Sequence, residues 1–385
     1  MLECKKDKNL VAPPLKILHL ISSRGLYGAE RIVINLIAAM DHRCFVHQLA
    51  LLRVEKNPNI EFIEAVREKQ AVSHIVLCRK WIDMEALRQV RKLIKQERID
   101  IVHCHEMKGR LYGLLATIGT KTRIITTNHN WIRSDFLVSC FESMDAFYIR
   151  FFPKIIAVSP EVQKLMCRYL VPDKKIQVII NGIDMNEFQQ DKAARNMIRK
   201  ELGINRNISL IGAFGRISPE KGQKYLIAAA VQVLNIFPEA RFLIVGDGFQ
   251  GEEMKEYATC LGISDRVIFA GFRKNISEFY SALDLFVLPS ILEGTPMALL
   301  EAMSAKTPVI ATRVGGVGRI IQNRKNGLLV SPANSEELAG AIIRLLQNSA
   351  EAKNLAKNAL CTVSEKYSSQ KMADEYIRLY TELTS

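Results

Sequence analysis

Residues 208–237 read ISLIGAFGRISPEKGQKYLIAAAVQVLNIF, an apolar strand joined to a helix by a loop with a glycine at each end. A strand with a crossover helix behind it is the repeating unit of a parallel sheet that helices cover on both faces. Five more apolar strands follow: RFLIVG (241–246), VIFAG (267–271), LFVLP (285–289), PVIAT (308–312) and GLLV (327–330). This half of the chain is therefore predicted to be a doubly wound α/β domain.

The first half of the chain shows the same alternation. Its strands are KILHLI (16–21), HQLALL (47–52), HIVLC (74–78), DIVHCH (100–105), RIITT (123–127), KIIAV (154–158) and KIQVII (175–180). The pattern breaks at NGIDMNEF (181–188) and then restarts, and 385 residues are too many for one ordinary hydrophobic core. We therefore expect two α/β domains, residues 15–182 and 183–367, whose ligands bind beyond the carboxyl ends of the strands.

The composition, with 48% hydrophobic and 24% charged residues, is that of a soluble globular protein. No apolar run approaches the ~20 residues that span a bilayer. Residues 1–16 lack the apolar stretch and cleavage site of a secretory signal. The eight cysteines form no Cys-x-x-Cys pair, so we expect reduced thiols. These features favour a cytoplasmic location.

The net charge of +13 is concentrated in the first half. Residues 1–190 hold 29 Lys and Arg against 20 Asp and Glu, whereas residues 191–385 hold 24 against 20. In RQVRKLIKQER (88–98) the basic residues share one helix face. That face is interpreted either as the solvated side of a core-packed helix or as a surface that attracts anionic lipid or an acidic acceptor. Nucleic acid is not expected, because no aromatic residues are interleaved with the basic ones.

The loop GRISPEKG (215–222) offers a phosphate two cations at the end of a strand. Arg216 can bind a phosphate through two hydrogen bonds, and Lys221 adds a point charge beside it. Gly215, and Gly246 in the next loop VGDGF (245–249), allow a ligand close to the backbone or simply turn the chain.

A third loop begins EGTPMALLEAM and follows the strand LFVLP. After Gly294, we predict Thr295 to be the N-cap of a helix and Pro296 its first residue. The amides of Met297 and Ala298 would then lie at the positive end of the helix dipole, where a diphosphate binds without a metal.

Two glutamates bracket the start of this helix. Glu301 lies five residues beyond Pro296, which places it about 140° around the helix axis from that residue. Glu293 precedes the helix, so the two carboxylates are expected to hold opposite ends of one ligand through its hydroxyl groups. The alternative is that Glu301 is an exposed helix residue and Glu293 an ordinary loop charge.

These motifs together resemble those of the family 4 retaining glycosyltransferases, which have the GT-B fold. The matching residues are Gly215-Arg216, Glu220-Lys221-Gly222, Gly246-Asp247-Gly248, Leu288-Pro289-Ser290, Glu293 and Glu301, and in the first half Gly28-Ala29-Glu30, Asp100, His103, His105, His129 and Asn181-Gly182-Ile183-Asp184. The resemblance covers about residues 15–385 and implies two Rossmann-like domains facing each other across a cleft. It also implies that a terminal helix at about 368–385 packs back on the first domain.

The resemblance implies roles for individual residues. Arg216 and Lys221 would bind the diphosphate of a nucleotide-sugar donor and stabilise the leaving group. Glu301 would hold the ribose, and Glu293 the hexose. A loop ending at Gly28 (residues 25–28) would close over the donor, and His129 would face the sugar or the acceptor.

The implied activity is retaining hexosyl transfer to a glycan or lipid-linked acceptor, in cell-surface polysaccharide or glycoconjugate synthesis. No Asp-x-Asp occurs, so we expect no metal site and no cofactor. The enzyme would work in the cytoplasm or peripherally on the inner face of the membrane. The alternatives are a nucleotide-sugar epimerase of the same fold and a non-catalytic protein that binds sugar nucleotides. A dehydrogenase is not supported, because no strand is followed by Gly-x-Gly-x-x-Gly.

Overall fold

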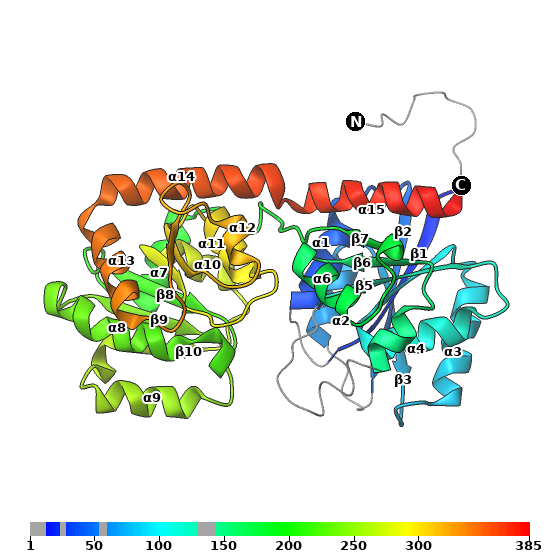
Figure 1. The fold of residues 1–385 in the computed structure, drawn as a ribbon, viewed down its shortest axis with the longest axis horizontal. Coiled ribbons are helices and arrows are strands. Elements are labelled where there is room, and N and C mark those ends of the chain that lie inside the picture. Colours follow the sequence, from blue (N-terminus) through cyan, green and yellow to red (C-terminus); the bar gives the residue numbers. More distant parts are fainter. Residues whose placement is uncertain (1–12, 24–27, 54–59, 130–143) are drawn as a thin grey trace. The chain divides into compact units, whose positions relative to one another are not determined.

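The computed structural model of the chain describes residues 13–23, 28–53, 60–129 and 144–385. The chain divides into two compact units, one of residues 1–180 with 372–385 and the other of residues 181–371. Each unit is built around one parallel sheet with helices on its two faces (Figure 1).

The first unit holds a seven-stranded sheet in the order β3-β2-β1-β4-β5-β6-β7. Its strands are β1 (Leu15–Ser22), β2 (Phe45–Arg53), β3 (Val72–Leu77), β4 (Ile101–His105), β5 (Arg123–Asn128), β6 (Lys154–Ala157) and β7 (Ile176–Val178). Its helices include α1 (Gly28–Ala39), α2 (Ile60–Glu68), α3 (Met84–Gln96), α4 (Glu106–Thr117), α6 (Pro160–Arg168) and α15 (Ser369–Thr384).

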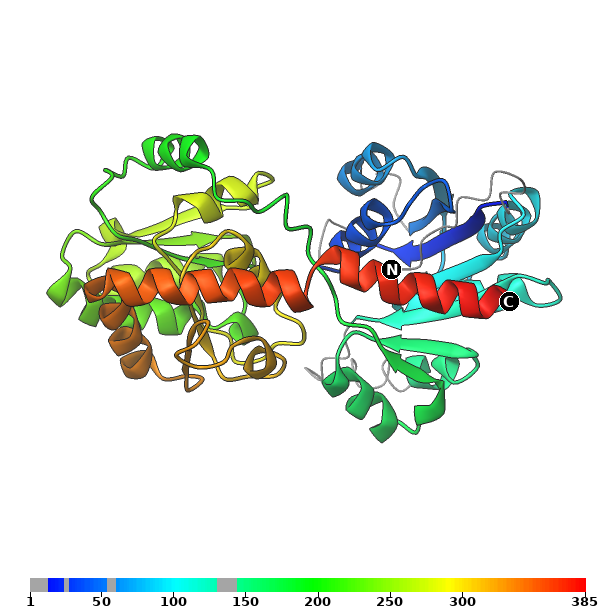
Figure 2. The same ribbon diagram turned by 90° about the horizontal axis from the view of Figure 1, so that it is seen from above.

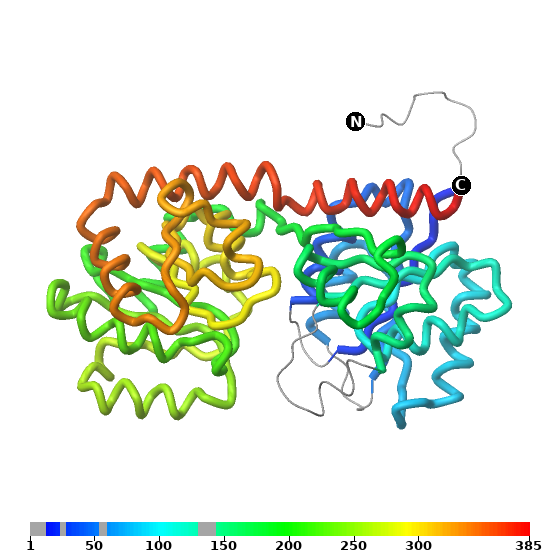
Figure 3. The backbone as a smooth tube through the Cα atoms, viewed as in Figure 1, coloured from blue at the N-terminus to red at the C-terminus, as the bar shows by residue number. Residues whose placement is uncertain are grey.

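Alternation of side chains along the strands divides this unit into two cores. Leu18 and Val102 point to the face covered by α3, α4 and α6, whereas Ile21 and Leu49 point to the face covered by α1 and α2. Helix α15 lies along the sheet of this unit (Figure 2), and its Tyr376 and Tyr380 are buried there. The chain enters α15 directly from the long helix that ends at residue 366 (Figure 3).

The second unit holds a six-stranded sheet in the order β10-β9-β8-β11-β12-β13. Its strands are β8 (Leu210–Phe214), β9 (Arg241–Val245), β10 (Val267–Gly271), β11 (Leu285–Leu288), β12 (Val309–Thr312) and β13 (Leu328–Val330). Its helices are α7 (Lys192–Glu201), α8 (Gln223–Ile236), α9 (Gly251–Cys260), α10 (Ile276–Ala282), α11 (Met297–Ser304), α12 (Val317–Ile320), α13 (Ser335–Gln347) and α14 (Ser349–Lys366). Every strand predicted from the sequence is present in the two sheets, within two residues at each end.

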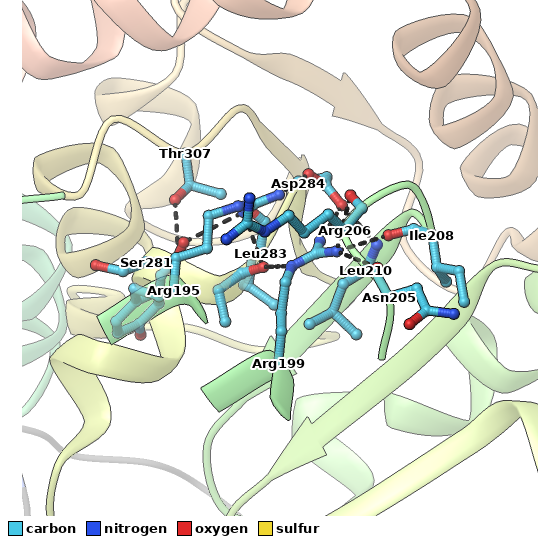
Figure 4. A network of polar contacts seen from close by, with 12 residues as sticks. Arg195, Arg199, Asn205, Arg206, Ile208, Leu210, Ser281, Leu283, Asp284 and Thr307 are labelled. Atoms are coloured by element: carbon cyan, nitrogen blue, oxygen red, sulfur yellow. Dashed lines mark hydrogen bonds and ion pairs between the residues drawn. The ribbon is translucent and has the colours of Figure 1, made fainter. Parts of the chain in front are cut away.

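Two arginines of helix α7 attach it to the second sheet through backbone carbonyls and the carboxylate of Asp284 (Figure 4). Asp284, just before β11, accepts hydrogen bonds from Arg195 at 2.6 Å and from Arg199 at 2.5 Å. It also accepts one from the backbone amide of Leu210, at the start of β8, at 2.8 Å. Arg199 is only 2% exposed, so its charge depends on this partner. The contact joins the first helix of the unit to the centre of the sheet.

Candidate active site

The loops at the carboxyl edge of the second sheet pack backbone against backbone. Gly315 follows β12 and has φ +45°, and a Cβ on it would lie 1.8 Å from the carbonyl oxygen of Glu293. Gly246 follows β9 with φ +132°, and a Cβ on it would lie 2.1 Å from the carbonyl oxygen of Gly215, after β8. Only glycine allows either approach. The loops after four strands are thereby held at one edge of the sheet.

Lys221 and Glu293 meet at this edge. The Nζ of Lys221 donates to Oε1 of Glu293 at 2.8 Å, and the hydroxyl of Ser290 donates to the same oxygen at 2.7 Å. The side chain of Glu293 is 5% exposed and that of Lys221 is 28% exposed. The carboxylate is therefore fixed in the protein, while the ammonium remains accessible to an anion beside it.

Arg216 lies in the same loop but has a different partner. Its Nη2 donates to Oε1 of Glu220 at 2.6 Å, and 63% of its side chain is exposed. The structure thus brings Lys221, but not Arg216, onto Glu293. Arg216 would have to exchange Glu220 for a phosphate, which an exposed ion pair allows at little energetic cost.

Helix α11 begins one residue later than the sequence predicts. Pro296, with ψ 90°, is its N-cap, and Met297 is its first residue, so the prediction of Thr295 as N-cap was wrong. The proline carbonyl accepts from the amide of Leu299 at 3.1 Å. The amides of Met297 and Ala298 come before that first bond and lie at the positive end of the helix dipole. Gly294 belongs to the loop that packs against Gly316.

Glu301 lies inside the unit rather than on its surface. It is 7% exposed, and its Oε2 accepts a hydrogen bond from the hydroxyl of Tyr280 at 2.8 Å. The same hydroxyl lies 3.1 Å from the carbonyl oxygen of Ala298. Tyr280 therefore ties the Glu301 carboxylate to the first turn of α11. The interpretation of Glu301 as an exposed helix residue is excluded.

In the first unit, His129 directly follows β5 at the carboxyl edge of the sheet. Its Nε2 lies 3.0 Å from Nδ1 of His105, the last residue of β4. Burial lowers the pKa of His129 to about 3, and the nearby Arg110 guanidinium acts in the same direction. His129 is therefore a neutral imidazole at physiological pH. Gly28 starts α1. Apart from its chain neighbours and its own helix, no described residue has an atom within 4 Å of where its Cβ would be. The rest of its predicted loop lies outside the described residues.

Arg110, on α4, forms hydrogen bonds with the last residues of β5. Its guanidinium pairs with Asp145 and donates to Oγ1 of Thr126 at 2.9 Å and to Oδ1 of Asn128 at 3.2 Å. Its side chain is 3% exposed. A buried guanidinium with this many partners fixes the backbone that leads to His129.

Several residues of these edges were not identified in the sequence. They are Gly315, Gly316 and Tyr280 in the second unit, and Arg110, Asp145, His19 and His47 in the first. The two glycines after the strand PVIAT were a readable signal, since adjacent glycines at a strand end mark a close backbone approach. The others gain their partners only through the fold.

Solved structures of glycosyltransferases share this fold. Anabaena HepE in complex with UDP and glucose superposes with a TM-score of 0.83 at 23% identity, over 96% of this chain and 100% of that one. The sucrose-phosphate synthase of Thermosynechococcus elongatus superposes with a TM-score of 0.77 at 21% identity, over 97% and 99% of the two chains. The fold is therefore the GT-B fold of two parallel-sheet α/β domains.

Two family models together match most of the chain. Glycosyltransferase Family 4 matches residues 27–187, and Glycosyl transferases group 1 matches residues 194–360. The chain belongs to the group 1 glycosyltransferases of family 4.

Curated relatives are similar over nearly the whole chain. The UDP-Gal:alpha-D-GlcNAc-diphosphoundecaprenol alpha-1,3-galactosyltransferase of Escherichia coli is 27% identical, over 96% of this chain and 97% of its own. The N-acetyl-alpha-D-glucosaminyl L-malate synthase of Bacillus anthracis is 27% identical over 84% of each chain. The first of these is named as a galactosyltransferase, and this chain is a glycosyltransferase.

Among the described residues, no helix combines the length and the apolar character needed to cross a membrane.

Proposed function

We propose that this enzyme is a retaining, metal-independent hexosyltransferase. It would move a hexose from a nucleoside-diphosphate sugar to a hydroxyl group of a glycan or lipid-linked acceptor in cell-surface polysaccharide or glycoconjugate synthesis. The observation that carries the proposal is the Lys221–Glu293 pair, 2.8 Å apart, in the loops that lead into α8 and α11. It joins a cation suited to a diphosphate with a fixed carboxylate suited to sugar hydroxyls.

We propose a metal-independent reaction because this edge of the sheet already carries positive charge. Lys221, the free end of α11 and, after release from Glu220, Arg216 would stabilise the charge that develops on the leaving diphosphate. Glu301, oriented by Tyr280, would accept hydrogen bonds from the ribose.

Retention is proposed to follow a front-face route. The bond from the sugar C1 to the phosphate oxygen breaks as the acceptor oxygen bonds to C1 on the same face. The leaving phosphate accepts the proton that the acceptor hydroxyl loses. A glycosyl–enzyme adduct trapped with a slow substrate would contradict this step.

The relatives narrow the donor and the acceptor that we propose. The name of the E. coli relative specifies UDP-galactose as donor and a sugar linked to diphosphoundecaprenol as acceptor. A lipid-linked acceptor of that kind would bring this enzyme to the inner face of a membrane.

Calorimetric titration with UDP, GDP and ADP in EDTA tests the donor site directly. We expect micromolar binding of one nucleotide, unchanged when magnesium is added, because protein cations take the place of the metal. Binding that appears only with a divalent ion would exclude metal independence. Conversion of the donor to a second sugar nucleotide without acceptor would instead identify an epimerase.

Membrane contact is proposed through the segment that leads into α3. Trp81, Ile82 and Met84 are 45%, 52% and 58% exposed, and they follow the basic pair Arg79-Lys80. Exposed apolar side chains beside basic ones suit an anionic lipid surface. We expect cosedimentation with phosphatidylglycerol vesicles that weakens in high salt and is lost when the three apolar residues become serine. Equal binding to phosphatidylcholine would exclude the electrostatic component.

A further inference from the structure

Strand β3 forms an outer edge of the first sheet and lacks the features that protect the other sheet edges. Among the described strands, those at the edges are β3 and β7 in the first sheet and β10 and β13 in the second. β7 and β13 are three residues long, and the register of β10 with β9 is broken between Phe269 and Gly271. β3 has six residues in unbroken register with β2. Short strands and irregularities keep an edge from pairing with another chain, and β3 has neither.

The side chains of β3 are uncharged and partly open to solvent. The strand reads VSHIVL, without a lysine, an acidic residue, a proline or a glycine. Val72, Ile75 and Leu77 are 54%, 44% and 49% exposed. Burial lowers the pKa of His74, so this residue is also neutral at pH 7. An edge strand that stays open to water usually carries lysine or proline, so β3 has the composition of a strand that is covered by a partner.

The free hydrogen-bonding groups of this edge follow from the ladder with β2. The amide of Cys78 donates to the carbonyl oxygen of Arg53 at 2.5 Å, and Arg53 is paired with Leu77. Backbone groups point alternately to the two sides of a strand, so the even-numbered residues of β3 bond to β2. The N–H and C=O groups of Ser73, Ile75 and Leu77 therefore point away from β2, toward the open edge.

We propose that β3 pairs antiparallel with β3 of a second copy of this chain, about a two-fold axis that passes between the two Ile75 residues. Ser73 of each copy is then opposite Leu77 of the other, and the two Ile75 residues are opposite each other. Each of these pairs exchanges two backbone hydrogen bonds, because its members are the residues whose N–H and C=O groups face the open edge. The two seven-stranded sheets become one continuous sheet.

The side chains fit this pairing on both faces of the sheet. A two-fold axis perpendicular to the sheet continues each face of one copy into the same face of the other. Ser73, Ile75 and Leu77 lie on one face, since Ile75 is paired with Leu51, which belongs to the core under α1 and α2. Ile75 therefore contacts its own counterpart there. Apolar and β-branched cross-strand pairs stabilise a sheet, and no like charges meet in the strand.

The chemistry of the edge favours a second copy over a foreign chain. Strand addition derives its affinity from backbone hydrogen bonds, whereas its selectivity comes from charges or side-chain pockets. β3 has no charge by which to select a foreign partner and none that repels its own counterpart. An interface built on one strand is small, and interfaces below about 1,200 Å² are typically weak. We therefore expect a reversible dimer with a Kd in the micromolar range.

Sedimentation equilibrium of the full chain tests the pairing. From micromolar to submillimolar concentration we expect the wild type to shift from monomer to dimer. Ile75→Lys places two ammonium groups opposite each other on strands whose paired Cα atoms are about 5.5 Å apart. This substitution is expected to raise the Kd by more than about tenfold, because an apolar pair is lost and like charges meet. Ile75 is 44% exposed, so the melting temperature of the monomer should be unchanged.

The matched control is Ile118→Lys. Ile118 lies at the end of α4 in the same unit and is 64% exposed, so the substitution makes the same chemical change on a surface outside β3. Ile118→Lys should associate like the wild type. Amide exchange adds a second readout: at high concentration the amides of Ser73, Ile75 and Leu77 should exchange slowly in the wild type and rapidly in Ile75→Lys.

A mixture of Ile75→Lys and Ile75→Glu tests the position of the axis. Each variant alone should remain monomeric, and the mixture should form a heterodimer because opposite charges then meet at the axis. A wild type that stays monomeric at submillimolar concentration would overturn the proposal, as would a dimer that Ile75→Lys leaves intact or that Ile118→Lys weakens equally. The dimer does not depend on the proposed function, so either can fail without the other.

Discussion

Replacing Lys221 with alanine is expected to lower kcat roughly 100-fold, the size of effect seen when one preorganised donor to a developing anion is removed. The ammonium offsets charge on the leaving diphosphate, and it also holds Glu293, whose side chain is 5% exposed. Without the lysine, Ser290 is the one hydrogen-bond donor seen on that carboxylate oxygen among the described residues. The measurement is steady-state turnover of the donor that calorimetry selects.

Lys224 provides the matched control for this experiment. It lies three residues further along, on α8, where it is exposed and its ammonium lies over the ring of Tyr225 at 5.0 Å. Lys224→Ala removes a lysine charge only three residues away without touching Glu293, so its turnover should be nearly that of the wild type. Equal losses in both variants would show a general electrostatic effect, and unchanged turnover in Lys221→Ala would remove Lys221 from the site.

Acidification from pH 7 to pH 5 is expected to unfold the first unit. His19, His47, His103 and His105 are at most 2% exposed, and burial is the main cause that lowers each pKa. In the unfolded chain these groups titrate near pH 6.5, so below that value the unfolded state binds more protons and stability falls. At pH 5 each contributes a loss of about 2 kcal/mol. Four such losses are comparable with the whole stability of a domain.

The sequence supplies an internal reference for this measurement. All seven histidines precede residue 130, and both tryptophans, at 81 and 131, are also in the first unit. Tryptophan fluorescence should therefore report a transition between pH 6.5 and pH 5, above the range in which ordinary carboxylates titrate. Amide exchange in the second unit should be unchanged over this range. Fluorescence that stays native down to pH 4 would contradict the depressed pKa values.

The sequence was informative where a feature is local. Strand cores were predicted because apolar runs of a few residues alternate with helical segments. Lys221 and Glu293 were identified from their positions in loops after such strands, and Glu301 from its position on the helix that follows Glu293. The start of α11 was missed by one residue, because Thr295 and Pro296 both suit a helix start and the backbone conformation decides between them. Helices α2, α6, α9 and α10 were not predicted from the sequence.

The hydrogen bonds of His19 with His47 and His105 could not have been predicted in this way. His19, His47 and His105 are separated by tens of residues, and each alone reads as a polar residue in an apolar strand. What places them in contact is the register of β2, β1 and β4, and a shift of one residue would move a whole strand to the other face. The pairing of Arg110 with Asp145 likewise depends on the packing of α4 against β5, which the sequence alone does not specify.

The position of α15 sets an order of events during synthesis. A ribosome completes the seven strands of the first sheet early, but the last helix that covers them emerges only after the entire second unit has been made. Until then the hydroxyls of Tyr376 and Tyr380 are missing from His103 and Thr127, and water has access to that part of the sheet. The sheet of the first unit therefore remains incompletely covered in the nascent chain while roughly half of the protein is still being translated.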